Sequence, residues 1–260
     1  MKKPGVCVLR TDGINCDEET FYAFELAGAA SRMVHINQLR AGEVNLADYQ
    51  ILALPGGFLY GDDVHSGKVL AVELASFLRE QLQAFTEAGK LIIGICNGFQ
   101  VLVRTGLLPN RQTGRIDATL MANNSGRFEC RWVKLLVEPS DCIFTKGMAG
   151  KIIDVQVAHG EGNFYGEPAV VDGIEQNKQV VFRYTDATGA GTGVYPANPN
   201  GSVNAIAGVC DKTGRIMGMM PHPERYVERT HYYNWRKREA NEPPHGLTIF
   251  QNAVGYAKES

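Results

Sequence analysis

The stretch "KLIIGICNGFQVLV", residues 90–103, joins an apolar run to a helix-like pattern within a few residues. Its first part is rich in leucine and isoleucine, which predicts a strand buried on both faces of a sheet. Gly94, Cys96 and Gly98 occupy the junction between strand and helix. This spacing is that of a nucleophile elbow, a strained turn that holds a reactive side chain at the edge of an α/β sheet. The stretch therefore predicts an α/β fold with Cys96 at the carboxyl end of a strand.

The first part of the chain repeats this alternation of strand and helix. Short apolar runs bounded by turn residues predict strands over residues 5–10, 31–36, 49–57 and 91–96. Apolar residues at helical spacing predict a helix over 17–29 and one long amphipathic helix over 68–90, which ends at a glycine cap. Strands separated by helices imply right-handed β-α-β units and a parallel sheet.

After residue 115 the pattern changes to alternating apolar and polar residues. This predicts antiparallel strands within 118–138, 151–166 and 180–186, and a hairpin around "DKTG", residues 211–214. The tail from 225 to 260 shows two helical patterns separated by "NEPPHG". We therefore expect residues 1–260 to form one domain. Its central sheet is Rossmann-like, mixed and largely parallel, with flanking helices and a helical C-terminal extension at about 227–260.

Composition excludes several classes of protein. The net charge is −2, which disfavours nucleic-acid or anionic-membrane binding, and there is no apolar run long enough to span a membrane. The N-terminus "MKKPGVCVLR" has no cleavage site and reads as a first strand rather than a signal peptide. The six cysteines form no C-x-x-C pair, which argues against a zinc site or a disulfide framework. We expect a cytoplasmic enzyme with reduced thiols and no metal or cofactor of its own.

A nucleophilic cysteine needs a base, and His222 in "MMPHPERY", residues 219–226, is the best candidate. A proline precedes both His222 and Glu224, which predicts an extended segment in which the two side chains share one side. Glu224 can then orient the imidazole, so that Cys96, His222 and Glu224 form a catalytic triad for acyl transfer. The competing interpretations are a buried structural cysteine and an incidental His-Glu pair on a surface loop.

A third element of an acyl-transfer site is "LPGGF", residues 54–58. A Pro-Gly-Gly turn after a buried strand leaves backbone N–H groups free to bind an oxyanion. We expect Gly57 to supply one N–H and Asn97 the other. Taken alone, this segment is better explained as an ordinary turn at the end of a strand.

Six motifs in this order resemble those of the class I glutamine amidotransferase family. The similarity is greatest to the branch that serves purine biosynthesis, the glutaminase subunits of phosphoribosylformylglycinamidine synthases. The motifs run over most of the chain, namely "PGGFLYGDD" (55–63), "GICNGFQ" (94–100), "NNSGRFECR" (123–131), "AHGEGNF" (158–164), "NPNGS" (198–202) and "MMPHPER" (219–225). Leu59 stands where that branch often has a serine, which leaves the triad untouched.

The resemblance implies an activity and partners. Glutamine is hydrolysed to glutamate and ammonia, and the ammonia passes through a channel to a synthetase subunit. That partner uses ATP and magnesium to form the amidine of formylglycinamide ribonucleotide, and in many organisms a third, small subunit joins the assembly. The triad and the oxyanion-hole positions of the family match the residues chosen above.

The resemblance also bears on substrate binding. Gln100 matches a position that contacts substrate glutamine in related amidotransferases; the alternative is a solvent-facing helix residue. Arg127 and Phe128 could frame the glutamine pocket. His159 and Glu161 could line the pocket or face the synthetase, or His159 could act as a second base.

Three rival functions remain open at this point. One is a glutaminase subunit that serves a different synthetase, although the motifs at 123–131 and 158–164 favour the purine enzyme. Another is a cysteine hydrolase of similar fold, which we would not expect to pair "PGGF" with a late "HPE". A third is a non-catalytic regulatory subunit, which predicts a missing triad residue. The sequence leaves the activity of the isolated chain and its oligomeric state open.

Overall fold

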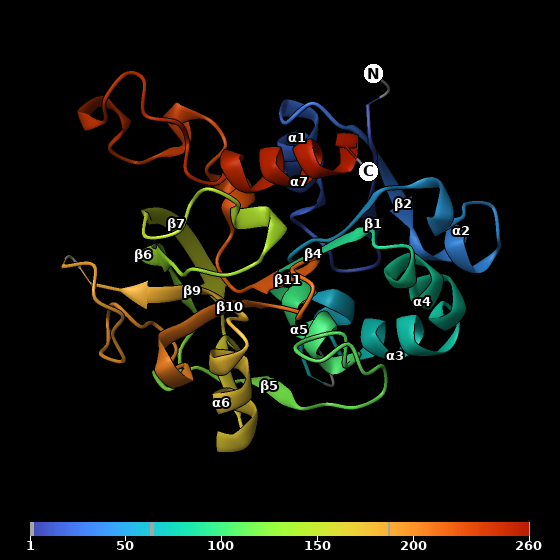
Figure 1. The fold of residues 1–260 in the computed structure, drawn as a ribbon, viewed down its shortest axis with the longest axis horizontal. Coiled ribbons are helices and arrows are strands. Elements are labelled where there is room, and N and C mark those ends of the chain that lie inside the picture. The colour runs from blue at the N-terminus through green and yellow to red at the C-terminus, as the bar shows by residue number, and fades with distance from the viewer. Residues whose placement is uncertain (1–2, 63–64, 187, 260) are drawn as a thin grey trace.

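The structure, a computed structural model, describes residues 3–62, 65–186 and 188–259. Within these ranges a nine-stranded sheet runs through the molecule in the order β2-β1-β3-β4-β11-β10-β9-β6-β7, and β5 and β8 form a separate pair (Figure 1). One half of the large sheet is parallel and the other half is antiparallel. The α/β class and the mixed central sheet expected from the sequence are confirmed.

The parallel half contains the four strands expected from the first part of the chain and one late strand. Each neighbouring pair in the series β2-β1-β3-β4-β11 runs parallel. Their middle members, β3 and β4, are buried along their whole length, as their continuous apolar sequences predict. The strands are β1 (Gly5–Arg10), β2 (Ala30–His35), β3 (Ile51–Leu54), β4 (Leu91–Ile95) and β11 (Ile216–Met219).

The antiparallel half is built by the second part of the chain, as predicted. β10 and β11 form the expected hairpin around residues 211–214, and β9, β6 and β7 continue the sheet with antiparallel pairing. The strands are β5 (Ala118–Met121), β6 (Glu129–Val137), β7 (Ile152–His159), β8 (Asn163–Gly166), β9 (Val180–Thr185) and β10 (Ile206–Cys210).

Helices cover both faces of the parallel half. Figure 1 shows α1 and α7 together on one side, and α3, α4 and α5 on the other; α6 lies beside β10 and β5. The helices are α1 (Asp17–Leu26), α2 (Ile36–Arg40), α3 (Lys68–Ser76), α4 (Arg79–Glu87), α5 (Asn97–Arg104), α6 (Pro168–Gln176) and α7 (Leu247–Glu259).

The long helix expected over residues 68–90 is wrong, because α3 and α4 are separate helices. The break lies at Leu78, whose φ of −107° and ψ of 9° leave the helical region. Leu78 is buried, whereas the preceding Phe77 is 65 % exposed and lies under the guanidinium of Arg40. No glycine or proline marks the break, so the periodic sequence reads through it.

The tail differs from the two helical patterns seen in its sequence. Only α7 is an α-helix; the segment ahead of it contains short 3-10 helices at Arg229–His231 and Trp235–Lys237. Tyr232 packs edge-on against Trp132 of β6, with ring centroids 4.8 Å apart. His245 accepts a hydrogen bond from the backbone N–H of Asp154 in β7. This segment therefore covers the antiparallel half of the sheet, while the assignment of the chain to one domain stays a prediction.

The order of the strands places four loops at the carboxyl ends of the parallel strands. The chain passes from β1 outward to β2, and then returns to the other side of β1 to form β3 and β4. Such a reversal opens a crevice at the carboxyl ends of the strands on either side of it, and ligands of open α/β sheets bind there. The loops that follow β1, β3, β4 and β11 all meet at these ends. Within the described residues, none of the helices has the length and apolarity that crossing a membrane requires.

Candidate active site

The turn between β4 and α5 has the geometry of a nucleophile elbow. Cys96 has a φ of 52° and a ψ of −106°, a conformation that is strained for any residue with a side chain. The flanking glycines allow the strand and helix to touch. A Cβ added to Gly98 would lie 1.9 Å from the carbonyl oxygen of Leu54, and one added to Gly94 would lie 2.5 Å from the carbonyl oxygen of Gly98. Close backbone contact therefore explains both glycines.

The elbow fixes Cys96 at the edge of the sheet and almost covers it. Its backbone N–H donates to the carbonyl of Met219 in β11, at 2.8 Å, and its Sγ lies 3.6 Å from the carbonyl oxygen of Ala158 in β7. Only 5 % of the residue is exposed. Cys96 immediately precedes α5, so its turn lies at the positive end of the helix dipole.

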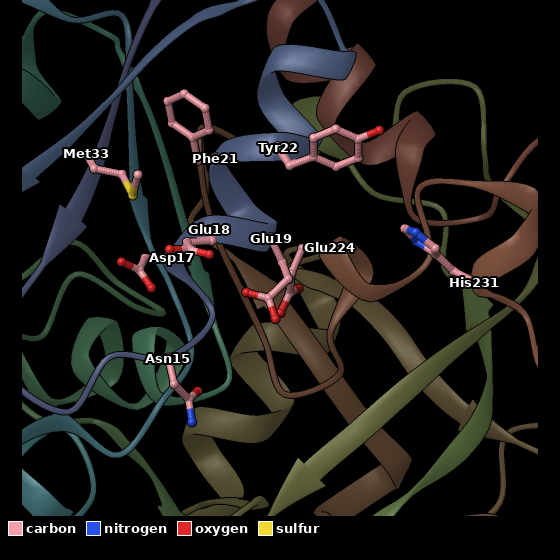
Figure 2. A pocket seen from close by; sticks show the side chains of 9 residues that line it. All are labelled: Asn15, Asp17, Glu18, Glu19, Phe21, Tyr22, Met33, Glu224 and His231. Carbon is pink, nitrogen blue, oxygen red and sulfur yellow. The ribbon is translucent and has the colours of Figure 1, made fainter.

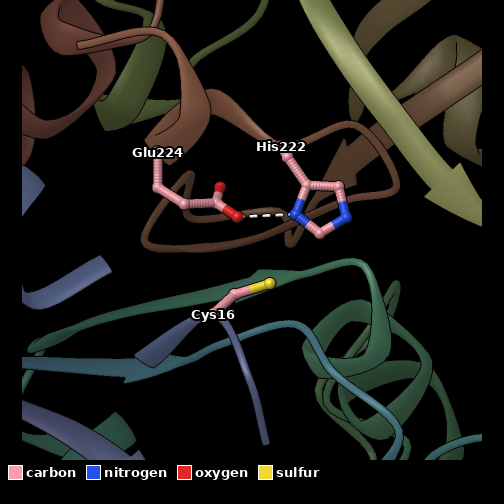
Figure 3. Close-up of side chains that lie close together, drawn as sticks. All are labelled: Cys16, His222 and Glu224. Atoms are coloured by element: carbon pink, nitrogen blue, oxygen red, sulfur yellow. Dashed lines mark hydrogen bonds and ion pairs between the residues drawn. The ribbon is translucent and has the colours of Figure 1, made fainter. Parts of the chain in front are cut away.

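His222 and Glu224 follow β11 and form a buried pair. Glu224 Oε1 lies 2.5 Å from His222 Nδ1, and each residue is 1 % exposed (Figure 3). The backbone N–H of His222 donates to the carbonyl of Gln156 in β7, at 2.7 Å, which anchors the segment across the sheet. The imidazole therefore carries its Nδ1 proton toward Glu224 and leaves Nε2 for proton exchange.

The pKa of His222 reflects its surroundings. Burial alone would lower this pKa, but the Glu224 carboxylate and the Cys96 sulfur outweigh burial and raise it well above its usual value. The influence of Cys96 requires that the two side chains lie close together. At neutral pH the site therefore favours an imidazolium held between a carboxylate and a cysteine sulfur.

Gly56, which the sequence analysis passed over, brings Cys96 and His222 together. A Cβ added to Gly56 would lie 2.8 Å from His222 Cε1 and 3.3 Å from Cys96 Cβ. The bare Cα of Gly56 therefore borders the space between nucleophile and base. The signal was present in the sequence, since both glycines of "PGG" follow a buried strand.

Gly57 and Asn97 occupy positions that suit the expected oxyanion donors. Gly57 has a φ of 156°, and an added Cβ would lie 2.7 Å from the carbonyl oxygen of Gly13. Among the described residues, no acceptor is found for the backbone N–H of Gly57. Asn97 is the first residue of α5, so its N–H has no acceptor within the helix. Their role as an oxyanion hole stays a prediction.

The side chain of Asn97 fixes the loop after β3 to the start of α5. Its Oδ1 accepts from the backbone N–H of Leu59 at 3.1 Å, and its Nδ2 donates to Asp62 Oδ1 at 3.1 Å. Leu59 is 2 % exposed, so the leucine that departs from the family pattern packs into the core. The last residue of this motif, Asp63, lies outside the described residues. The loop that carries Gly57 is thus held in register with Cys96.

Gln100 is buried rather than solvent-facing. Its Nε2 donates to the carbonyl of Glu161 at 2.6 Å, and its Oε1 accepts from Asn97 Nδ2 at 2.7 Å. The amide therefore ties α5 to the 159–162 loop. A contact between Gln100 and substrate glutamine stays a prediction, since both ends of its amide already have protein partners.

The motifs at 123–131 and 158–164 interlock through Asn123. Its Nδ2 donates to the carbonyls of Arg127 and His159, each at 2.8 Å, and its Oδ1 accepts from the N–H of Gly162 at 3.0 Å. Asn123 is 4 % exposed. It thereby holds the two loops together next to the end of β7, beside Cys96. The sequence placed both motifs in the family pattern without assigning this role.

Phe128 and Arg127 point to different places. Phe128 stacks on Phe58, with ring centroids 6.1 Å apart, and both rings are about half exposed at 50 % and 47 %. Phe58 directly follows Gly57, so this pair lies beside the proposed oxyanion loop. Arg127 instead lines a separate surface cavity with Asn124 and Tyr195. Binding of glutamine by Arg127 or Phe128 stays a prediction.

His159 is held neutral inside the protein. Burial, together with the nearby His222 and Arg131, lowers its pKa to about 3. Its Nδ1 lies 3.1 Å from Asn123 Oδ1. This environment suits a structural role in the loop pair better than a second base, because a general base works best with a pKa near the operating pH.

Cys16 is a second cysteine at the same edge, and the sequence analysis did not single it out. It follows β1, precedes α1 and is 1 % exposed. Its backbone N–H donates to the carbonyl of Gly56 at 3.2 Å, and Arg225 Nη2 donates to its Sγ at 3.2 Å. The Cys16 sulfur, a ring nitrogen of His222 and a carboxylate oxygen of Glu224 all lie within 4.8 Å of one another. In the described part of the chain, this is the one group of such side chains placed closely enough to hold a metal ion.

Comparison with known proteins agrees with this geometry. Residues 3–257 match the family described as CobB/CobQ-like glutamine amidotransferase domain. The PurQ subunit of phosphoribosylformylglycinamidine synthase from Dehalococcoides mccartyi is 49 % identical over 260 residues, which is 100 % of both chains. The corresponding subunit from Methanococcus maripaludis is 46 % identical over 266 residues, 97 % of each chain.

A solved structure extends the similarity to the fold. The structure of PurLQS from Thermotoga maritima contains a chain that superimposes with a TM-score of 0.75 at 34 % identity, covering 98 % of this chain and 99 % of that one. The family match, the relatives and the structural similarity each extend over nearly the whole chain. The chain therefore belongs to the glutamine amidotransferase family, within the group of PurQ subunits of phosphoribosylformylglycinamidine synthase.

Proposed function

We propose that this chain is the glutaminase subunit of a phosphoribosylformylglycinamidine synthase and that Cys96, His222 and Glu224 are its catalytic triad. The observation that carries this proposal is a strained cysteine elbow beside a buried His-Glu pair joined at 2.5 Å. Cys96 alone could be structural and the pair alone could be incidental. Their placement on adjacent parallel strands, β4 and β11, supports a common chemistry.

The first half-reaction releases ammonia. The Sγ of Cys96, with its proton on His222, attacks the side-chain amide carbon of glutamine. The carbonyl oxygen becomes an oxyanion, which the N–H groups of Gly57 and Asn97 stabilise. The C–N bond then breaks, and His222 gives its proton to the leaving nitrogen. A glutamyl thioester on Cys96 and free ammonia result.

The second half-reaction restores the enzyme. The now neutral His222 takes a proton from water, which attacks the thioester carbon. The C–S bond breaks, glutamate leaves, and the proton remains on His222 beside the Cys96 sulfur. Glu224 keeps the imidazole in one tautomer and stabilises its charged form in both halves of the cycle.

The ammonia is consumed by a partner. By similarity to the Thermotoga maritima assembly, the chain binds a synthetase subunit and a small third subunit. The synthetase uses ATP and magnesium to convert formylglycinamide ribonucleotide to its amidine. All six cysteines of this chain lie in the described part and are free thiols, as expected for a cytoplasmic enzyme.

We expect the isolated chain to have almost no glutaminase activity. Cys96 is only 5 % exposed, and the stacked rings of Phe58 and Phe128 join the loop after β3 to the 123–131 motif. Glutamine therefore needs a rearrangement of these loops, and docking of the synthetase beside the two half-exposed rings can supply it. Such dependence prevents wasteful hydrolysis of glutamine.

The test is glutamate release by the wild type, Cys96→Ser and the matched control Cys130→Ser, each with and without the cognate synthetase. We expect release that rises with the partner in the wild type and in Cys130→Ser, and that is lost in Cys96→Ser. Full activity without the partner would refute the idea of a subunit that is inactive alone while leaving the triad intact. Absence of glutamate in every mixture, with binding of the partner demonstrated, would refute the glutaminase assignment.

A second measurement separates the purine enzyme from a glutaminase that serves another synthetase. The reconstituted complex is given glutamine, ATP, magnesium and formylglycinamide ribonucleotide, and the amidine product is followed. Glutamate release without amidine formation would favour a different synthetase partner. Hydrolysis of other acyl substrates in preference to glutamine would favour a cysteine hydrolase.

A further inference from the structure

Cys16, His222 and Glu224 form a compact group of three ligand types. Their ligand atoms lie within 4.8 Å of one another, and each residue is 1 % exposed. In Figure 3 the Cys16 side chain lies below the His222–Glu224 contact, on a separate segment of the chain. Thiolate, imidazole and carboxylate together are the ligand set that Zn²⁺ binds in proteins, commonly through three residues and a water.

Two polar atoms of this group lack partners. Among the described residues, neither His222 Nε2 nor Glu224 Oε2 forms a hydrogen bond, although both are buried. Burial of an unsatisfied carboxylate oxygen carries a free-energy cost. Since His222 Nε2 is the nitrogen that exchanges a proton with Cys96, Glu224 Oε2 is the unused ligand atom in the group that includes the Cys16 sulfur.

An acidic cavity leads to the same carboxylate. A cavity of about 830 Å³ is lined by the loop after β1, the first turns of α1, and Glu224. Figure 2 shows Glu18 and Glu19 on the wall that also carries Glu224. The acidic wall attracts cations. Glu224 contributes to this wall although its side chain is buried, so a cation in the cavity reaches the carboxylate only when the wall opens.

One positive charge opposes a cation at this place. The guanidinium of Arg225 donates to Cys16 Sγ at 3.2 Å. A second arginine, Arg10, is engaged by Asp17 on the cavity wall, at 2.6 Å. Repulsion from Arg225 weakens the site. It is consistent with reversible binding rather than with a permanent structural metal.

We propose that this group is an inhibitory site for a soft divalent cation of the Zn²⁺ class. The ion reaches the group through the acidic cavity and binds Cys16 Sγ, His222 Nδ1 and a Glu224 oxygen, while the Cys16 thiol proton and the Nδ1 proton pass to solvent. Binding removes His222 from proton exchange with Cys96. The inhibitory effect rests on the proposed glutaminase function, whereas metal binding does not depend on it.

Two readouts on the full chain in complex with its synthetase test this proposal. The first is the ultraviolet thiolate-to-Cd²⁺ charge-transfer band, measured on the wild type, Cys16→Ser, Cys96→Ser and Cys130→Ser. We expect the band in the wild type, in Cys96→Ser and in Cys130→Ser, and its loss in Cys16→Ser. A band that is lost with Cys96→Ser and kept with Cys16→Ser would overturn the proposal, because the metal would then sit on the proposed nucleophile.

The second readout is inhibition of glutamate release by Zn²⁺, expressed relative to the uninhibited rate of each variant. We expect Cys16→Ser to need at least about tenfold more Zn²⁺ for half-inhibition. Equal sensitivity of the wild type and Cys16→Ser would overturn the inhibitory role. If a Cys16 variant does not fold, Glu224→Gln takes its place in the Cd²⁺ titration, where unchanged affinity overturns the site. A Cys16-dependent band in a chain that lacks glutaminase activity would leave the metal site standing and remove the proposed function instead.

Discussion

Two turns of this molecule place a cysteine between a parallel strand and a helix, and they differ in backbone conformation and in the charge of the helix that follows. Cys96 follows β4 with a φ of 52°, between glycines that allow backbone contact. Cys16 follows β1 with an unstrained φ of −114° and is succeeded by Asp17, Glu18 and Glu19 in the first turn of α1. The comparison shows that a cysteine at a sheet edge is not by itself a nucleophile.

The helix that follows each cysteine explains the difference. The first turn of α5 contains no acidic residue, so its N–H groups and dipole can stabilise an oxyanion. The first turn of α1 contains three acids instead, and Cys16 Sγ already accepts a hydrogen bond from Arg225. Both sulfurs adjoin His222, yet only the Cys96 turn combines a base, an uncharged helix start and a strained backbone. The acids of the first turn of α1 favour a cation near Cys16.

The largest expected effect comes from replacing each of the two cysteines by serine in separate variants. Cys96→Ser is expected to lower kcat for glutamine hydrolysis at least about 10⁴-fold, because a hydroxyl is a far weaker nucleophile in this setting. Cys16→Ser is expected to retain activity within about tenfold of the wild type. Steady-state glutamate release in the presence of the synthetase measures both. Losses of equal size would break the comparison between the two turns.

The next effect concerns Glu224, the carboxylate paired with the histidine that both turns adjoin. Glu224→Gln is expected to lower kcat about 10³-fold, because the imidazole loses its orienting partner. The Glu224 carboxylate raises the pKa of His222, so the substitution should lower that pKa. The imidazolium then disappears at lower pH, and the alkaline limb of the kcat profile shifts toward lower pH.

The matched control for this carboxylate is Glu228→Gln, which removes a carboxylate that contacts Tyr22 rather than His222. Its pH profile should coincide with that of the wild type. If Glu224→Gln left the profile in place, Glu224 would not be the group that sets the charge state of His222.

A third effect isolates the backbone of the Cys96 turn. In Gly98→Ala the new methyl group meets the Leu54 carbonyl, since a Cβ there lies 1.9 Å from its oxygen. We expect the free energy of unfolding to fall by about 3 kcal/mol or more. Gly255→Ala in α7 meets no atom within 4 Å and should instead raise it by about 0.5–1 kcal/mol. Denaturant titration compares the two, and a tolerated Gly98→Ala would refute the close contact.

The smallest effect contrasts the two buried histidines beside the elbow. The pKa of His159 is lowered to about 3 from its usual 6.5. Between these two values the imidazole is protonated in the unfolded chain and neutral in the folded protein. Stability should therefore fall as the pH falls from 6.5 toward 3, by about 2 kcal/mol at pH 5. In His159→Gln this part of the acid dependence should vanish, as unfolding curves at several pH values would reveal. An unchanged slope would mean that His159 is protonated in the fold.

His222 carries the opposite sign. Its pKa is raised in the folded protein, so its contribution to stability is fully present below about pH 6.5 and is lost as the pH rises through the raised value. The two histidines therefore act on different sides of neutrality. The unfolding curves that test His159 also register this alkaline loss.

The sequence allowed prediction of what depends on local spacing. The elbow could be predicted because Gly94, Cys96 and Gly98 adjoin a run that can only be a buried strand. The contact between His222 and Glu224 was expected, but for the wrong reason, because only His222 is extended, whereas Pro223–Arg225 form a 3-10 helix instead of the extended segment that the two prolines predicted. The parallel and antiparallel halves followed from a change of periodicity near residue 115.

What could not be predicted depends on contacts between distant segments. The break at Leu78 arises from how α3 and α4 pack, and no local signal marks it. Gly56 and Cys16 approach His222 only because β1, β3 and β11 share one sheet edge. Burial of Gln100 results from a hydrogen bond to Glu161, which lies 61 residues further along the chain. The spacing of residues within one segment carries no information about contacts between distant segments.

The most direct test of the account is to locate the cysteine that reacts with a glutamine analogue. The complex with its synthetase is incubated with a diazoketone analogue of glutamine, digested, and mapped by peptide mass spectrometry. We predict a single adduct on Cys96, none on Cys16, and protection of Cys96 by excess glutamine. An adduct on Cys16, or unprotected labelling of several cysteines, would contradict the assignment of the Cys96 turn as the site of glutamine attack.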